Sequence, residues 1–170
     1  MKTIKQFLKP MLLAFLIIAG FSVTRAQDST VTENKSEHTI EQLLNAKQFV
    51  FVPQSVLPTT GRMRQLTSYY DVTLKGNTLI SFLPYFGRTY TAPVDFTRSA
   101  LDFTSNSFEY NVENRKKGGW DVIVKPKDQT NVRQYMFTVF DNGSATLRVL
   151  SNNSQPITFN GYVTESKQRS

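Results

Sequence analysis

Apolar and polar residues alternate with a period of two over much of the chain, which is the spacing of a β-strand with one buried face. Turn signals such as Gly76-Asn77 and Asn142-Gly143 separate the alternating runs. Proline has no N–H for a strand ladder, so Pro53 is expected to end the first run. The runs cover residues 49–52, 70–75, 78–83, 108–113, 120–125, 134–140, 145–150 and 157–162. The pattern predicts an all-β fold, an antiparallel meander that forms either a small barrel or a strongly curled sheet.

One segment has the spacing of a helix instead. Ile40, Leu43 and Leu44 fall on one helical face, and Thr39 is suited to the N-cap position. The sequence therefore predicts one short helix over residues 39–48, directly before the first strand.

Residues 1–26 have the three-part pattern of a secretory signal peptide. Lysines at positions 2, 5 and 9 precede an uncharged apolar run over residues 11–21, and Thr24 and Ala26 supply the small residues of a cleavage site. As a helix this run is about 17–20 Å long, whereas the hydrocarbon core of a bilayer is about 30 Å thick. We therefore expect cleavage after Ala26, no transmembrane anchor after cleavage, and export. A periplasmic location is the expectation, with secretion or surface display as the alternatives.

The rest of the chain is expected to hold a flexible leader over residues 27–38, a single β-rich domain over residues 39–165 and a polar tail over residues 166–170. The chain has 170 residues, no cysteine and one histidine, His38, in the expected leader. The absence of cysteine excludes disulfides, thiolate nucleophiles and cysteine-ligated metals. Part of the formal charge of +7 comes from basic residues of the expected signal peptide, so we expect no nucleic-acid partner.

The acidic residues give little support for an enzyme. Most of them fall at outward strand positions or in turns, where a solvated charge is the ordinary explanation. Asp102 is flanked by the apolar residues Leu101 and Phe103, but the alternation directs its side chain outward as well. A hydrolase remains an alternative that would need two carboxylates to converge in one cleft. We expect no enzyme activity, no catalytic or metal-binding residues and no cofactor.

The aromatic residues of the strand runs can be interpreted in two ways. In the first, they fill the core of the sheet. In the second, they line a cavity for an apolar or amphipathic, lipid-like small molecule. The candidate lining residues are Tyr70, Phe82, Phe108, Tyr110, Trp120, Tyr135, Phe137 and Phe159. Four of them, Tyr70, Tyr110, Trp120 and Tyr135, are candidate contacts for a ligand or partner.

Apolar residues also fall on the nominally outer face of the sheet. Ile123, Met136, Phe140 and Leu150 occupy outward positions of their strand runs. The N-terminal helix or a partner, such as an envelope protein, is expected to cover this face.

The segment over residues 84–88 follows a predicted strand and has a composition suited to a shaped corner. Pro84 must end or distort the strand, and Gly87 permits a close backbone approach. Tyr85, Phe86 and Arg88 are therefore candidate contacts for a ligand or partner. In the structural alternative, Tyr85 or Phe86 packs into the core and Arg88 forms an ion pair.

The chain resembles exported proteins of Bacteroidetes that are catalogued as domain of unknown function 4251. The resemblance covers about residues 40–164, and the Leu-Pro-Tyr-Phe-Gly-Arg segment over residues 83–88 is its most specific part. It is also carried by Phe49-Val50-Phe51, Pro58, Tyr70-Asp71-Val72, Gly76-Asn77, Trp120, Asn142-Gly143, Ala145, Leu147, Ile157 and Gly161. The resemblance implies export and one β-rich domain, and it supplies no catalytic residues.

Two functions follow from these observations. The first is a non-enzymatic exported module that binds an apolar or amphipathic small molecule in an aromatic-lined interior. The second is a cell-envelope module that contacts another protein through the segment 84–88.

Overall fold

The computed structural model describes residues 39–90 and 99–166, all of which lie within the compact unit Glu37–Ser170. The expected signal peptide, the expected leader with His38, and residues 167–170 of the expected tail lie outside the described residues. Within the described ranges, no helix has both the length and the apolar character needed to cross a membrane.

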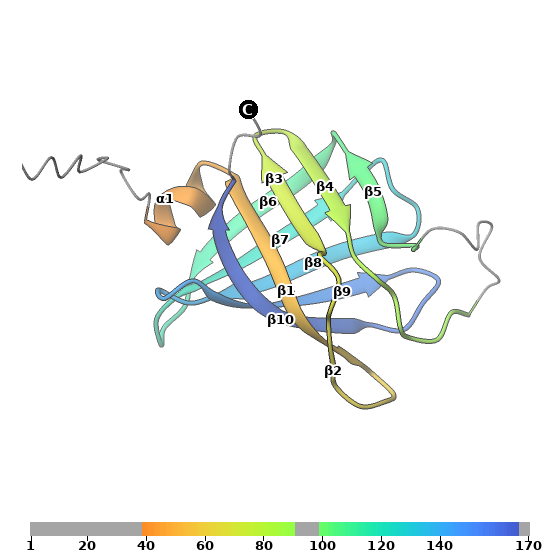
Figure 1. Cartoon of the computed structure of the whole chain (residues 1–170). Coiled ribbons are helices and arrows are strands. Elements are labelled where there is room, and N and C mark those ends of the chain that lie inside the picture. The colour runs from red at the N-terminus through yellow and green to blue at the C-terminus, as the bar shows by residue number, and fades with distance from the viewer. Residues whose placement is uncertain (1–38, 91–98, 167–170) are drawn as a thin grey trace, which may run out of the picture. The chain divides into compact units, whose positions relative to one another are not determined.

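The described residues form one antiparallel sheet that is nearly closed into a barrel (Figure 1). Its strands are β1 (Gln48–Pro58), β2 (Arg64–Gln65), β3 (Asp71–Lys75), β4 (Thr78–Phe82), β5 (Asp102–Ser105), β6 (Phe108–Asn114), β7 (Trp120–Pro126), β8 (Val132–Val139), β9 (Ser144–Ser151) and β10 (Ile157–Glu165). They are ordered β5-β4-β3-β1-β10-β9-β8-β7-β6, and β2 pairs with β1 outside this path. The predicted all-β meander with one short helix is confirmed.

Strand β1 joins the two halves of the sheet. It pairs with β10 from Phe49 to Pro58, and on its other edge it pairs first with β3 and then with β2. A register shift between Pro53 and Ser55 marks the bend. The prediction that Pro53 ends this strand is therefore wrong, because a bulge tolerates a residue without an N–H. Opposite the bend, a Cβ at Gly161 would overlap the carbonyl oxygen of Val52 and lie 2.8 Å from Pro53 Cα.

The two end strands of the sheet, β5 and β6, are consecutive in the chain and are not paired with each other. The Asp128 carboxylate lies beside the turn between them and accepts hydrogen bonds from the Ser105 hydroxyl and, at 3.0 Å, from the Asn106 N–H. Both bonds lower the pKa of Asp128, and the bond from Ser105 has the larger effect. Gln129 donates a further bond of 3.2 Å to the Thr104 carbonyl oxygen. Side chains therefore hold the open seam where the strand ladder stops.

The interior of the sheet is occupied by buried side chains that contact one another. The ring of Phe137 packs edge-on against Phe49 and Phe51, with centroid distances of 5.8 and 5.7 Å. The Tyr135 hydroxyl lies 2.8 Å from Ser81 Oγ, which itself donates to the Leu101 carbonyl oxygen at 2.6 Å. The buried polar groups of this layer are thus paired with each other, as a packed interior requires.

Helix α1 (Ile40–Asn45) is shorter than the predicted range 39–48. Thr39 and Gln42 form a capping box at its start, and Lys47 has a positive φ of 54° just after its end. Leu43 and Leu44 are buried in the core, and the Tyr110 hydroxyl donates to the Leu44 carbonyl oxygen at 2.7 Å.

The helix packs against β1 and β10. Met136 and Phe140 remain 37% and 41% exposed, so the helix does not provide the predicted cover for these two outward residues.

Candidate functional site

The predicted aromatic lining residues lie in the core, with one exception. Tyr135, Phe137 and Phe159 are fully buried, whereas Tyr70, Phe108, Tyr110 and Trp120 are half-buried and pack against the core. Burial raises the pKa of both Tyr110 and Tyr135. The structure brings most of these side chains together as packed core, in which the Tyr135 hydroxyl contacts Ser81 and the Tyr110 hydroxyl donates to the Leu44 carbonyl oxygen.

The prediction that Phe82 lines the interior is wrong. Its side chain is on the outer face of β4 and is 45% exposed. Leu79, Ser81 and Leu83 occupy the inner positions of this segment, so the period of two places Phe82 outside. The inner position of Ser81 follows from its hydrogen bonds with Leu101 and Tyr135.

The segment 84–88 forms a corner held by Tyr85. The Tyr85 hydroxyl lies 2.9 Å from the carbonyl oxygens of both Arg88 and Gln155, which share its single proton, and burial raises the pKa of Tyr85. The ring lies against Gly87, where a Cβ would overlap the hydroxyl oxygen and lie 2.6 Å from Cζ. Tyr85 therefore has the structural role that the sequence left as an alternative.

The other two candidates of this corner lie on the surface. Phe86 is 41% exposed, and the guanidinium of Arg64 lies 5.5 Å from the centre of its ring. The Arg88 side chain is exposed.

The corner positions the loop between β9 and β10. The Gln155 N–H donates to the Arg88 carbonyl oxygen at 3.0 Å, and the Tyr90 N–H donates to the Asn153 carbonyl oxygen at 2.8 Å. From the other side, the Thr59 hydroxyl donates to the Pro156 carbonyl oxygen at 2.5 Å. The part of the sequence most specific to the resemblance thus fixes a loop about 70 residues away in the chain.

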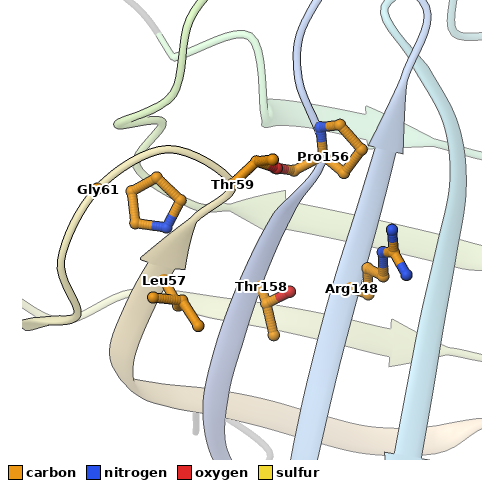
Figure 2. Close-up of a pocket in the computed structure, with 7 residues that line it drawn as sticks. Leu57, Thr59, Gly61, Arg148, Pro156 and Thr158 are labelled. Atoms are coloured by element: carbon orange, nitrogen blue, oxygen red, sulfur yellow. The ribbon is translucent and has the colours of Figure 1, made fainter.

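This loop forms one wall of a shallow pocket on the outer face of the sheet. The pocket has a volume of about 260 Å³ and is lined by Leu57, Pro58, Thr59, Gly61, Arg148, Pro156 and Thr158 (Figure 2). Leu57, Thr158 and Arg148 are register partners on β1, β10 and β9, so their outward side chains form one row. We refer to this feature as the Arg148 pocket.

Arg148 is the charged group of the pocket. Its cross-strand neighbours are Met136 on β8 and Thr158 on β10, so no carboxylate stands opposite it. Within residues 39–90 and 99–166 its guanidinium makes no hydrogen bond and no ion pair. An arginine has five N–H donors and a permanent charge, and these donors are therefore open to an anion.

No local signal in the sequence marks Arg148 as a binding residue. In the sequence it is one polar residue between Leu147 and Val149, as expected at any outward strand position. Arg148 lacks a carboxylate partner because Met136 and Thr158 lie beside it on the neighbouring strands. The pattern of a single strand does not show which residues lie beside it. A list of outward residues across paired strands would have found it.

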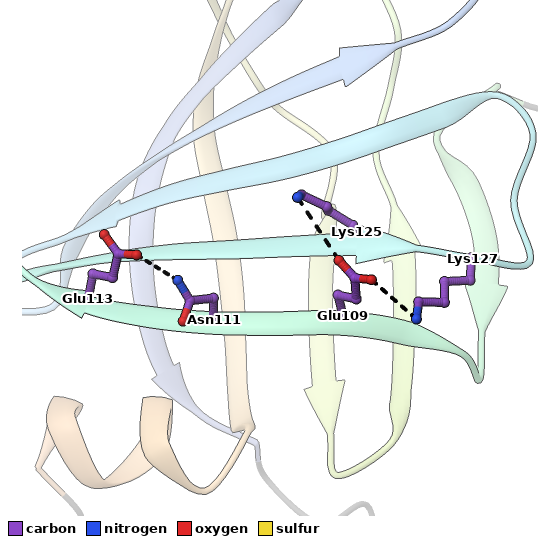
Figure 3. A network of polar contacts seen from close by, with 5 residues as sticks. All are labelled: Glu109, Asn111, Glu113, Lys125 and Lys127. Atoms are coloured by element: carbon purple, nitrogen blue, oxygen red, sulfur yellow. Dashed lines mark hydrogen bonds and ion pairs between the residues drawn. The ribbon is translucent and has the colours of Figure 1, made fainter.

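In contrast to Arg148, the charged side chains on the outer face of β6 and β7 have partners (Figure 3). Glu109 lies 3.2 Å from Lys127 and 4.0 Å from Lys125, and Asn111 donates to Glu113 at 2.7 Å. These charged groups are exposed and already paired, which suits the edge of a sheet. They form a solvated surface and do not enclose a cleft.

Two further acidic residues, Asp121 and Asp71, also have partners within the fold. Asp121 accepts from the Thr138 hydroxyl at 2.8 Å and lies 3.3 Å from Arg115, and Asp71 accepts from the Thr73 hydroxyl at 2.7 Å. Among the described residues, no group of three or more histidine, cysteine or acidic side chains is placed to hold a metal ion.

Comparisons with known proteins agree with the fold. The profile of a family described as domain of unknown function (DUF4251) matches residues 32–163. A crystal structure of a DUF4251 family protein from Bacteroides eggerthii DSM 20697 is similar, with 19% sequence identity and a TM-score of 0.53. The match covers 72% of this chain and 82% of that chain, and at this identity it supports the fold alone. A search of curated proteins finds no match. Because the profile spans most of the sequence, the chain belongs to the DUF4251 family.

Proposed function

We propose that the chain is an exported, non-enzymatic binding module that holds an anionic amphipathic ligand in the Arg148 pocket. The observation that carries this proposal is the unpaired guanidinium of Arg148 in a pocket that Leu57 and Pro156 line in part. A carboxylate or phosphate head would accept bonds from Arg148 and Thr158, and an apolar body would lie against Leu57 and Pro156.

The absence of enzyme activity belongs to the same proposal. Among the residues that the structure describes, the groups with a shifted pKa are Tyr85, Tyr110, Tyr135 and Asp128. Burial or hydrogen bonds within the fold account for each shift, and none of these groups lines the Arg148 pocket. This supports a function in binding, and not in proton transfer, for the Arg148 pocket.

The experiment compares two small probes that differ in charge. Octanoate and octanamide have the same alkyl chain, and each is titrated into the isotope-labelled protein while the NMR signals of Arg148 Nε–Hε and the Leu57 methyl groups are followed. We expect octanoate to shift these signals. We expect Arg148→Gln to weaken octanoate binding about 10-fold or more, because a charge-assisted hydrogen bond contributes about 1.5–3 kcal/mol.

The matched control is Arg133→Gln, which removes an exposed cation outside the pocket and is expected to leave binding unchanged. Equal affinity for octanoate and octanamide, or an Arg148→Gln protein that binds octanoate normally, would contradict the proposal.

An apolar ligand in the interior is the second candidate, because the buried aromatic cluster is compatible with it. Such a ligand would have to displace side chains, since Tyr135 and Phe137 are buried and stack with their ring centroids 6.2 Å apart. Native mass spectrometry of protein purified from its own host distinguishes the two. A bound mass that survives Arg148→Gln favours the interior, and one that is lost favours the pocket.

A further inference from the structure

A second, larger hollow lies where β1 changes partners. Strand β1 pairs with β3 up to Phe51 and with β2 from Ser55. Between these two pairings it runs beside the segment 66–70, to which it is joined by the bond of 2.9 Å from the Leu66 N–H to the Gln54 carbonyl oxygen. The resulting groove has a volume of about 600 Å³. Bulged strands often lie beside binding sites because they redirect the chain locally.

The lining of this groove has no charged side chain. Gln54, Gln65, Thr67 and Ser68 line it with exposed amide and hydroxyl groups. Within the part of the chain that the structure describes, none of these four side chains makes a hydrogen bond. Amides and hydroxyls both donate and accept, so the groove offers paired donors and acceptors with no net charge.

Aromatic rings lie along one side of the same groove. Tyr69 is 63% exposed and Tyr70 is half-buried, and both belong to the lining. The Tyr70 ring lies 5.5 Å from the ring of Phe82, whose outward position extends the aromatic surface onto β4. The faces of such rings are negative and attract weakly positive C–H groups.

We propose that this groove binds a neutral oligosaccharide. Sugar hydroxyls match the amides and hydroxyls of Gln54, Gln65, Thr67 and Ser68, and the C–H faces of pyranose rings match Tyr69 and Tyr70. A charged ligand has no countercharge in the lining, and a purely apolar ligand would cover the amides without pairing them. An added peptide strand is also disfavoured, because Pro53, which belongs to the lining of the groove, has no N–H to donate.

The test is an NMR titration that follows the side-chain amide signals of Gln54 and Gln65. The probes are cellotetraose, maltotetraose, mannotetraose and tetra-N-acetylchitotetraose, each up to about 20 mM. We expect at least one of them to shift both amides with a dissociation constant of about 0.1–5 mM. We expect tetragalacturonate, which is anionic, to bind more weakly than the neutral sugars.

Two variants test whether sugar binding depends on side chains of the groove lining. Tyr69→Ala is expected to weaken binding of the neutral sugar about 5-fold or more, and Gln65→Ala is expected to weaken it as well. The matched control is Tyr90→Ala, which removes a ring that is similarly exposed, at 68%, but lies outside the groove lining. It is expected to leave the affinity unchanged.

Three results would overturn the proposal. The first is that no neutral sugar of the panel shifts the two amides. The second is that Tyr90→Ala and Tyr69→Ala weaken binding equally. The third is that an extended Thr-Val octapeptide shifts the amides more than any sugar, which would assign the groove to strand addition. Arg148→Gln is expected to leave sugar binding unchanged, so failure here and failure of the Arg148 pocket are distinguishable.

Discussion

The hydroxyl group of Tyr85 joins two loops that are far apart in the sequence. It can reach the carbonyl oxygens of Arg88 and Gln155 because its ring lies directly on Gly87. The position of the Tyr85 ring therefore requires a residue without a side chain at position 87. This gives a physical reason for the composition of the segment 83–88, which the sequence alone left open between a binding corner and a structural one.

The first prediction at this scale concerns the coupling between these two residues. Gly87→Ala places a methyl group where the Tyr85 hydroxyl lies, so the ring must move and the hydroxyl loses its contact with the two carbonyl oxygens. We expect it to lower the free energy of unfolding by about 1–3 kcal/mol. In a Tyr85→Ala background the same change is expected to cost much less. Urea unfolding of the four proteins in this double-mutant cycle measures the coupling.

The control cycle pairs Gly87→Ala with Tyr90→Ala. The Tyr90 side chain is exposed and is not among the atoms nearest to a Cβ at Gly87, so these two effects are expected to add. Additive effects in the Tyr85 cycle would show that the contact between Tyr85 and Gly87 does not shape the corner.

At the scale of the strands, one carboxylate, that of Asp128, accepts two of the hydrogen bonds at the turn between β5 and β6. Hydrogen bonds from Ser105 and Asn106 lower the pKa of Asp128, so the folded protein favours the ionised form more than the unfolded chain does. Its contribution to stability is therefore fully present above the unfolded pKa of about 4. It is lost as the pH falls from there through the lower pKa of the folded state.

The second prediction follows from that sign. Asp128→Asn is expected to lower the urea midpoint at pH 7, and the difference from the unchanged protein is expected to shrink as the pH is lowered below about 4. Asp141→Asn removes the same charge from another turn and is the control. A difference between Asp128→Asn and the unchanged protein that stays constant from pH 7 to pH 3 would contradict this role of the carboxylate.

The strands also show which features of the fold a local sequence pattern predicts. The period of two located most strands, and Pro84 ended β4 as expected. Four features escaped it. Strand β2 has two residues and strand β5 has four, which are too few to show a period. The bulge at Pro53 depends on pairing with β10, which the local pattern does not contain. Hydrophobicity alone does not separate the outward Phe82 from the buried Leu83.

At the scale of the whole described domain, β1 and β10 join the two halves of the sheet, whereas its end strands β5 and β6 are not paired with each other. The pairing of β1 with β10 links residues about 110 positions apart in the chain, and no local pattern contains it. This is why the sequence left a barrel and a curled sheet equally open. Both candidate binding sites depend on the same pairing, since the Arg148 pocket crosses β1, β10 and β9 and the groove follows the bend of β1.

The last prediction concerns the cooperativity of this domain. Trp120, the single tryptophan of the chain, packs against the core at the start of β7, so its fluorescence reports on the half of the sheet next to the seam. Circular dichroism reports on all strands together. Because β1 ties both halves through one continuous core, we expect the urea transitions from the two signals to coincide. A tryptophan transition at clearly lower urea would mean that β6 and β7 open at the seam while β1 and β10 stay paired, and would contradict a single cooperative unit.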